Sequence, residues 1–293
     1  MEAENNKKQA KFAVYSGRNV ASGEPIVRIK QSFNEAAVGK VTGAQIREED
    51  ALDDDTIALF LPGITNDNSP YYEEIGEDGN KKIREYVENG GVFLGGCAGA
   101  YYACADILYD PPWLDQPKTS QPGLNFFNGI AHGPVPHHAK ETGSPDWSVD
   151  CTHAEIEFTG EDNKKKTTDI IYGNGPMYYP DKNEEEQLNI IARYNTMEGK
   201  PVAIATKQVG KGLAIFLGVL PYYGTDLYEG MKMADSQQEF LDSIAPYEQD
   251  RKEIWDMVIN IIKEHREKVV QNRELEQSSK PLGSKTLGNK PQF

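Results

Sequence analysis

The sequence contains little of what would tie it to a nucleic acid, a membrane or a disulfide framework. Its 31 Lys and Arg residues are outnumbered by 46 Asp and Glu residues, which gives a net charge of −15. Nucleic acids and anionic membranes need basic surfaces, so we expect neither as a partner. No run is apolar enough for a transmembrane helix, and the chain begins without an apolar signal segment. We therefore expect a soluble, cytoplasmic protein, although the mature form of an exported protein has the same features.

Cysteine is scarce as well. The three cysteines, Cys97, Cys104 and Cys151, are an odd number without regular spacing, which does not indicate a disulfide framework. No cysteines and histidines have the spacing of a zinc site. We expect no metal and no other cofactor.

The chain does contain a short apolar run that ends in a small-residue turn around one cysteine. Residues 92–94 are apolar, and Gly95 and Gly99 flank Cys97 with one residue between on each side. This is the spacing of a nucleophile elbow, a strained strand-to-helix turn. A thiol at the amino end of a helix is favoured as thiolate. A buried cysteine in an ordinary tight turn explains the same pattern.

The order of the predicted elements indicates an α/β fold. We expect strands at residues 11–15, 38–42 and 56–61, a helix at 79–89, and the strand that leads to Cys97. Residues 25–29 fit a strand or a helix. Alternating strands and helices form a parallel sheet covered on both faces. The turn at Cys97 then lies at the carboxyl end of a central strand, where such sheets place their sites.

From about residue 109 the pattern becomes rich in strands. We expect them at residues 125–135, 154–159, 168–172, 188–195, 201–205 and 212–217, the last two joined as a hairpin. These largely antiparallel strands are expected to extend the same sheet, with residues 109–180 as an insertion or a lid. A helix over 250–270 completes a domain of residues 11–272, between a flexible start (1–10) and a disordered tail (273–293).

A thiol nucleophile needs a base, an oxyanion hole and a pocket. The backbone N–H of Ala98, directly after the cysteine, is the first candidate oxyanion donor. The second is Gly63 or Ile64, in the turn after the strand at 56–61. An ordinary strand-ending turn is the alternative explanation of Pro62 and Gly63.

The segments that carry these turns resemble a known family. Pro62 and Gly63, Tyr71 and Tyr72, residues 79–91 and residues 97–103 look like the amino-terminal domain of the long biotin–protein ligases. That domain resembles class I glutamine amidotransferases and also occurs as a free-standing protein. No biotin-binding loop of a ligase catalytic domain is evident, so the chain resembles the free-standing form. The resemblance implies a flavodoxin-like three-layer α/β sandwich with a mostly parallel central sheet.

The resemblance is dense over residues 57–105 and weaker at three later places, residues 133–134, 172–175 and 209–212. Class I amidotransferases carry a His-x-Glu motif after a glycine-lysine-glycine hairpin and an apolar strand. By position, Leu220 stands where that histidine would be and Tyr222 where the glutamate would be. Leucine cannot accept a proton. The resemblance therefore implies a nucleophile turn without its usual base.

Other residues are candidates for the missing groups. A histidine could come from His132, His137, His138 or His153, although exposed loop histidines are the more common case. Glu73 or Glu74 could hydrogen-bond the thiol, or belong to a solvated loop. Arg84 is expected in a structural ion pair on its helix, with anion binding as the alternative. Asp226 and Glu229 are candidates for the carboxylate.

Two hypotheses follow. The favoured one is a glutamine amidotransferase-like module that binds an unknown small molecule or protein partner in the cleft over Cys97 without hydrolysis. The alternative is a cysteine-dependent amide hydrolase or amidotransferase, acting on a C–N bond with a histidine from a non-standard position. The residues expected around this cleft are Gly63, Ile64, Tyr71, Tyr72, Glu73, Gly96, Cys97, Ala98, Tyr101 and Leu220.

Overall fold

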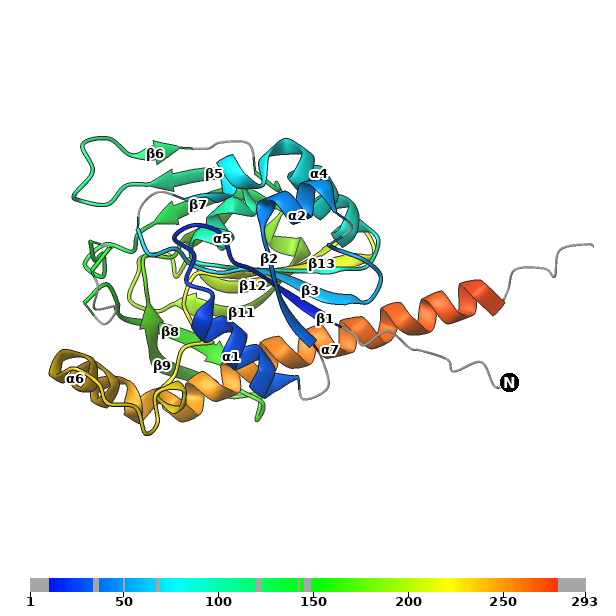
Figure 1. Cartoon of the computed structure of the whole chain (residues 1–293). Helices are drawn as coiled ribbons and strands as arrows, with labels where there is room; N and C mark the ends of the chain where they lie inside the picture. Colours follow the sequence, from blue (N-terminus) through cyan, green and yellow to red (C-terminus); the bar gives the residue numbers. More distant parts are fainter. Residues whose placement is uncertain are drawn as a thin grey trace, which may run out of the picture.

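Five parallel strands form the part of the sheet that leads to Cys97. The computed structural model describes residues 11–33, 37–49, 51–66, 69–119, 123–141, 143–144 and 149–278, and Figure 1 shows how the elements lie. The five strands are, in sheet order, β2 (Ala37–Val41), β1 (Lys11–Tyr15), β3 (Thr56–Leu61), β4 (Val92–Gly96) and β13 (Gly212–Leu217). This order is that of the flavodoxin-like folds. The expected fold class is confirmed.

Helices cover both faces of these strands (Figure 1). On one face lie α2 (Gly43–Glu48), α3 (Tyr71–Glu74), α4 (Gly76–Glu88) and α5 (Ala98–Tyr102), and on the other α1 (Gly23–Ser32) and α7 (Glu248–Ser278). Successive side chains along a strand point to opposite faces of the sheet and therefore pack in different cores. Phe60 of β3 packs in the core with α1 and α7, whereas Leu59 packs in the core with α2 and α4.

The second half of the chain extends the same sheet. Beyond β13 the order continues with β12 (Val202–Val209), β10 (Met177–Pro180), β7 (Phe127–Gly133), β5 (Cys104–Tyr109) and β6 (Lys118–Thr119). A branch from β12 holds β11 (Leu188–Tyr194), β8 (Thr152–Thr159) and β9 (Lys165–Tyr172). All these pairs are antiparallel except β5 with β7. Strands β6 to β10, which all lie between residues 109 and 180, are therefore part of the same sheet. The role of this region as an insertion or a lid stays a prediction.

Several elements differ from the sequence predictions. The helix after Cys97 is a single turn, because β5 begins at Cys104. Residues 25–29, for which the sequence left a strand or a helix open, lie in a helix, α1. The strands β5 and β10 were not predicted, nor was helix α6 (Asp235–Ile244). Short 3₁₀ turns occupy Glu185–Gln187, Thr225–Leu227 and Ala245–Tyr247.

The predicted end of the domain at residue 272 is wrong, because α7 continues to Ser278. Its last turns are held by polar contacts. Arg273 pairs with Asp54 at 2.9 Å, and Glu276 pairs with Lys211 at 3.0 Å. A sequence search for an apolar stripe misses such turns. The predicted flexible start (1–10) and the rest of the predicted tail (279–293) lie outside the described residues. Within the described ranges, no helix is long and apolar enough to cross a membrane.

The backbone of α5 lies directly against the end of β3. A Cβ atom added at Gly99 would be 1.9 Å from the carbonyl oxygen of Leu61 and 2.7 Å from its Cβ. Only glycine allows this approach, and any larger residue must push α5 away from the strand.

We expect Gly99→Ala to lower the free energy of unfolding by about 3 kcal/mol or more, because the clash is with backbone atoms that cannot rotate away. Gly23→Ala is the matched control, since a Cβ at Gly23 meets nothing within 4 Å. It should change stability by about 0.5 kcal/mol or less. Urea unfolding followed by circular dichroism measures both. Equal effects of the two substitutions would contradict the steric explanation.

Candidate functional site

The turn after β4 puts Cys97 in a backbone conformation that side chains rarely adopt. Its φ is 49° and its ψ is −109°, which costs on the order of 1–3 kcal/mol. Glycines on both sides make the turn sterically possible. A Cβ at Gly95 would be 2.7 Å from the carbonyl oxygen of Gly99. The strand–turn–helix corner (residues 95–99, the Cys97 corner) therefore depends on its small residues.

The turn after β3 lies beside this corner. A Cβ at Gly63 would be 3.4 Å from the Cys97 Cβ and 3.7 Å from its Sγ. The hydroxyl of Tyr71 donates to the carbonyl oxygen of Pro62 at 2.6 Å and holds the turn in place. The adjacency of the two turns follows from the pairing of β3 with β4. The roles of Gly63, Ile64 and Ala98 as oxyanion donors remain a prediction.

A cavity of about 700 Å³ opens over the corner. Among the predicted residues, Ile64, Tyr72, Glu73, Cys97, Ala98 and Tyr101 line it. Gly63, Tyr71, Gly96 and Leu220 are not among the lining residues; Tyr71 and Leu220 are buried at 0% and 6% exposure. Sequence reasoning missed the part of the lining that comes from distant loops and strands. It includes Arg18, Asn19, Ile107, Tyr109, Lys118 and Asn174.

The thiol of Cys97 already has a partner. Its Sγ–H donates to the carbonyl oxygen of Gly173, 2.9 Å away, and the residue is 9% exposed. A carbonyl oxygen favours the protonated sulfur, because its negative dipole end would repel a thiolate. No disulfide is present among the described residues.

The acidic residues near the cavity are paired too. Glu73 accepts a hydrogen bond from Arg18 at 2.8 Å, and Glu74 accepts one from the hydroxyl of Tyr15 at 2.7 Å. Glu73 is therefore bound to the cavity rim. Arg84 forms its ion pair with Glu77 on the same helix, α4, which confirms the structural role expected for it.

The histidines lie elsewhere. His153 contacts the hydroxyl of Ser243 at 3.1 Å, and His265 contacts the carbonyl oxygen of Gly90 at 3.2 Å. Burial lowers the pKa of both. The ring of His132 faces Tyr179 and that of His138 faces Tyr172, each with 6.3 Å between ring centroids. No histidine is among the described residues that line the cavity.

The segment after β13 fills the place beside the corner with other side chains. Leu220 is buried. The hydroxyl of Tyr222 lies against the corner, since a Cβ at Gly96 would be 2.6 Å from it. Burial and the neighbouring Cys97 raise the pKa of Tyr222 well above its usual value, and an interaction with the backbone of Gly63 lowers it in part. The phenol therefore keeps its proton.

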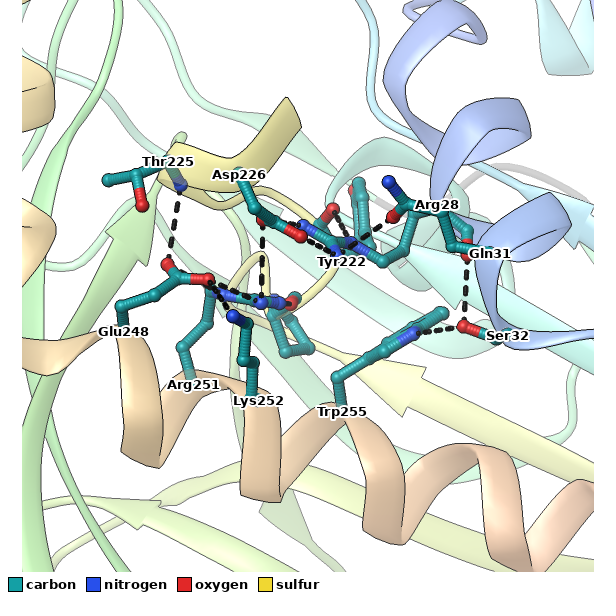
Figure 2. Close-up of polar contacts among 11 residues, drawn as sticks. Arg28, Gln31, Ser32, Tyr222, Thr225, Asp226, Glu248, Arg251, Lys252 and Trp255 are labelled. Carbon is teal, nitrogen blue, oxygen red and sulfur yellow. Dashed lines mark hydrogen bonds and ion pairs between the residues drawn. The ribbon is translucent and has the colours of Figure 1, made fainter. Parts of the chain in front are cut away.

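Two buried arginines hold this segment in place (Figure 2). The Arg28 Nε donates to the carbonyl oxygen of Tyr222 at 3.1 Å, and Arg251 donates to that of Pro221 at 2.6 Å. Arg28 also binds both carboxylate oxygens of Asp226, at 2.6 and 2.7 Å. Asp226 therefore serves this network and not a catalytic histidine.

Burial alone would raise the pKa of Asp226, but the hydrogen bonds and charge of Arg28, with a smaller contribution from Arg251, lower it to about 2. Glu248 completes the network by binding Arg251 at 2.7 Å. Helix α7 is tied to α1 nearby, since the Trp255 indole donates to Ser32 at 2.9 Å. Elsewhere in the described part of the chain, no group of three or more metal-ligating side chains is present.

Comparisons with known proteins agree with the expected resemblance. A family model described as biotin-protein ligase, N terminal, matches residues 13–282. An uncharacterized protein from Chlamydia muridarum is 30% identical over 181 residues, which cover 62% of this chain and 66% of that protein. A biotin–protein ligase from Schizosaccharomyces pombe is 26% identical over 235 residues, which cover 77% of this chain but only 35% of the ligase.

Among solved structures, a glutamine amidotransferase from Thermotoga maritima aligns with a TM-score of 0.48 and 12% identity, over 88% of this chain and 99% of that one.

We expect Asp226→Asn to lower the free energy of unfolding at pH 7 by on the order of 3 kcal/mol, because both buried arginines lose a charged acceptor. The folded pKa is depressed, so the stabilisation is complete above the unfolded value of 3.8 and is lost as the pH falls toward about 2. The difference between the two proteins should therefore shrink below pH 4. Urea unfolding at pH 7, 4 and 3 measures it.

The exposed Asp256, on the same helix as Arg251, gives the control substitution Asp256→Asn with the same change of charge. It should leave stability nearly unchanged at each pH. A stability difference for Asp226→Asn that stays constant from pH 7 to pH 3 would refute the ionic explanation.

Proposed function

Because the chain belongs to the family of biotin–protein ligase N-terminal domains, we propose that it is a glutamine amidotransferase-like module that binds a ligand over Cys97 without hydrolysing it. Its ligand is a small molecule, since a cavity of about 700 Å³ lies within the size range of small-molecule sites. A protein partner that inserts a side chain into the same cavity is the second option.

The observation that carries this proposal is that no histidine is among the described residues that line the cavity over the thiol. Leu220, buried behind the corner, stands where the histidine of an amidotransferase would stand. Tyr222, where the glutamate would stand, keeps its proton. The sulfur itself faces a carbonyl oxygen. Attack on an amide requires a thiolate, or a base that removes the proton during attack.

The alternative is a cysteine-dependent amide hydrolase or amidotransferase that recruits a histidine from an unusual position. One observation favours it. The strained backbone of Cys97 has the geometry of a nucleophile elbow, and strain of this kind concentrates at functional sites. The same conformation also suits a binding site, because it turns the sulfur toward the cavity.

Cys97 reactivity separates the two functions. We expect iodoacetamide to alkylate Cys97 slowly at pH 6 and at neutral pH, because the thiol donates its proton to the carbonyl oxygen of Gly173. Mass spectrometry of the Cys97 peptide from pH 5 to pH 10 gives the profile. Limited access to the cavity lowers the alkylation rate by the same factor at every pH and does not move the midpoint of the pH profile. The midpoint therefore decides between the two functions. We also expect no covalent adduct with a glutamine-derived chloroketone.

Cys97→Ser is the control for site assignment in both measurements. Fast alkylation at pH 6 together with an adduct from the glutamine analogue, both absent in Cys97→Ser, would establish the hydrolase and refute the binding module.

A further inference from the structure

Gly173 and Asn174 line the cavity, and we call residues 173–176, which continue from them into the core, the wall. The four successive carbonyl groups of the wall each accept a hydrogen bond from a side chain. The donors are Cys97 to Gly173 at 2.9 Å, Tyr101 to Asn174 at 3.1 Å, Tyr172 to Gly175 at 2.7 Å and Tyr194 to Pro176 at 3.1 Å. We refer to these four donors as the donor quartet. Buried backbone carbonyl groups need hydrogen-bond partners, and here side chains supply all four of them.

The donor quartet comes from four different elements. Cys97 follows β4 and Tyr101 lies in α5, whereas Tyr172 ends β9 and Tyr194 ends β11. The quartet therefore ties the wall to the parallel part of the sheet and to its antiparallel branch at the same time. Burial raises the pKa of all three phenols well above its usual value, so each remains a donor at neutral pH.

The rest of the wall is equally constrained. Asn174 has a positive φ of 63°, and its side-chain amide pairs with both backbone groups of Lys140, at 3.0 and 2.5 Å. A Cβ at Gly175 would be 2.1 Å from the carbonyl oxygen of Gly218, and one at Gly173 would be 3.2 Å from Leu220. The wall thus packs on the residues that replace the catalytic base.

We propose that Cys97 is a positioning residue whose thiol acts as a hydrogen-bond donor that holds the 173–176 wall of the cavity, and that this is its task in place of nucleophilic attack. The inference deepens the proposed function, because a non-hydrolytic site needs a fixed wall and not a thiolate. It makes the donor at position 97 essential and the sulfur atom replaceable.

Cys151 offers a probe of the wall. Its Sγ lies on the wall beside Gly173, 3.7 Å from where a Cβ of that residue would be, and burial raises its pKa to about 12. Cys151 is partly exposed in the closed wall, so N-ethylmaleimide alkylates it at a basal rate in the native full-length chain. Opening of the wall exposes more of the thiol, and the rise above the wild-type rate, resolved by mass spectrometry, measures the opening.

We expect Cys97→Ala to leave the Gly173 carbonyl without its donor and to raise the Cys151 alkylation rate about tenfold, the effect of losing roughly one hydrogen bond. Cys97→Ser keeps a donor at the same position and should label at the wild-type rate. If Cys97→Ser labels as fast as Cys97→Ala, or Cys97→Ala labels like the wild type, the positioning role is refuted.

Tyrosine-to-phenylalanine substitutions test the other donors without creating cavities. Tyr101→Phe, Tyr172→Phe and Tyr194→Phe should each accelerate Cys151 labelling by a similar factor. The matched control is Tyr178→Phe, because the buried hydroxyl of Tyr178 has no hydrogen-bond partner among the described residues. It should leave the rate unchanged, and an equal acceleration in Tyr178→Phe would show that the quartet has no special role. These variants also carry the test if Cys97→Ala does not fold.

The two proposals fail in different ways. Acylation of wild-type Cys97 by an amide would refute the non-hydrolytic function and, with it, the inference that positioning replaces nucleophilic attack. An inert Cys97 combined with equal labelling of those two variants would refute the positioning role alone.

Discussion

The close approach of Gly99 to the carbonyl group of Leu61 is the constraint on which the candidate site depends. It presses α5 onto the end of β3, which forces the chain to reverse direction within the single residue Cys97. The positive φ of Cys97 follows from this geometry. The neighbouring turn at Gly63 then has to lie against the same residue, because β3 and β4 are paired and end at the same edge. A cavity forms over the edge because parallel strands and short loops leave space at their carboxyl ends.

Interactions between residues far apart in the sequence determine which side chains lie beside the Cys97 corner. Arg28 and Asp226 are 198 residues apart, yet their bidentate contact fixes the segment after β13. This contact places Leu220 and the Tyr222 hydroxyl beside Cys97. An arginine suits the task because its planar group can bind a carboxylate and a carbonyl oxygen together.

The sequence was sufficient where local pattern and fold agree. The predicted apolar runs at 56–61 and 212–217 coincide with β3 and β13. Strands that are buried on both faces are nearly continuous apolar runs, so the length of the run predicts the length of the strand. The glycines around Cys97 likewise predicted the corner. Other features left no local signal. The end of α7 is held by ion pairs, and the cavity residues Arg18 and Lys118 come from segments about a hundred residues apart. The sequence could not predict the donor quartet, because its acceptors are backbone carbonyl groups, which every residue has.

A strained corner of this kind can have a function other than presenting a nucleophile. The conformation of Cys97 costs on the order of 1–3 kcal/mol. The hydrogen bonds of the quartet contribute about 0.5–1.5 kcal/mol each, and only the strained conformation aims the thiol at Gly173. The same turn that presents a nucleophile to a substrate can therefore present a donor to a wall of the protein. In the proposed non-hydrolytic site, the chemical property that such a corner supplies is an S–H group at a defined position. If Cys97 has the proposed positioning role, the carbonyl group of Gly173 needs a donor at position 97, which Cys and Ser supply and Ala does not.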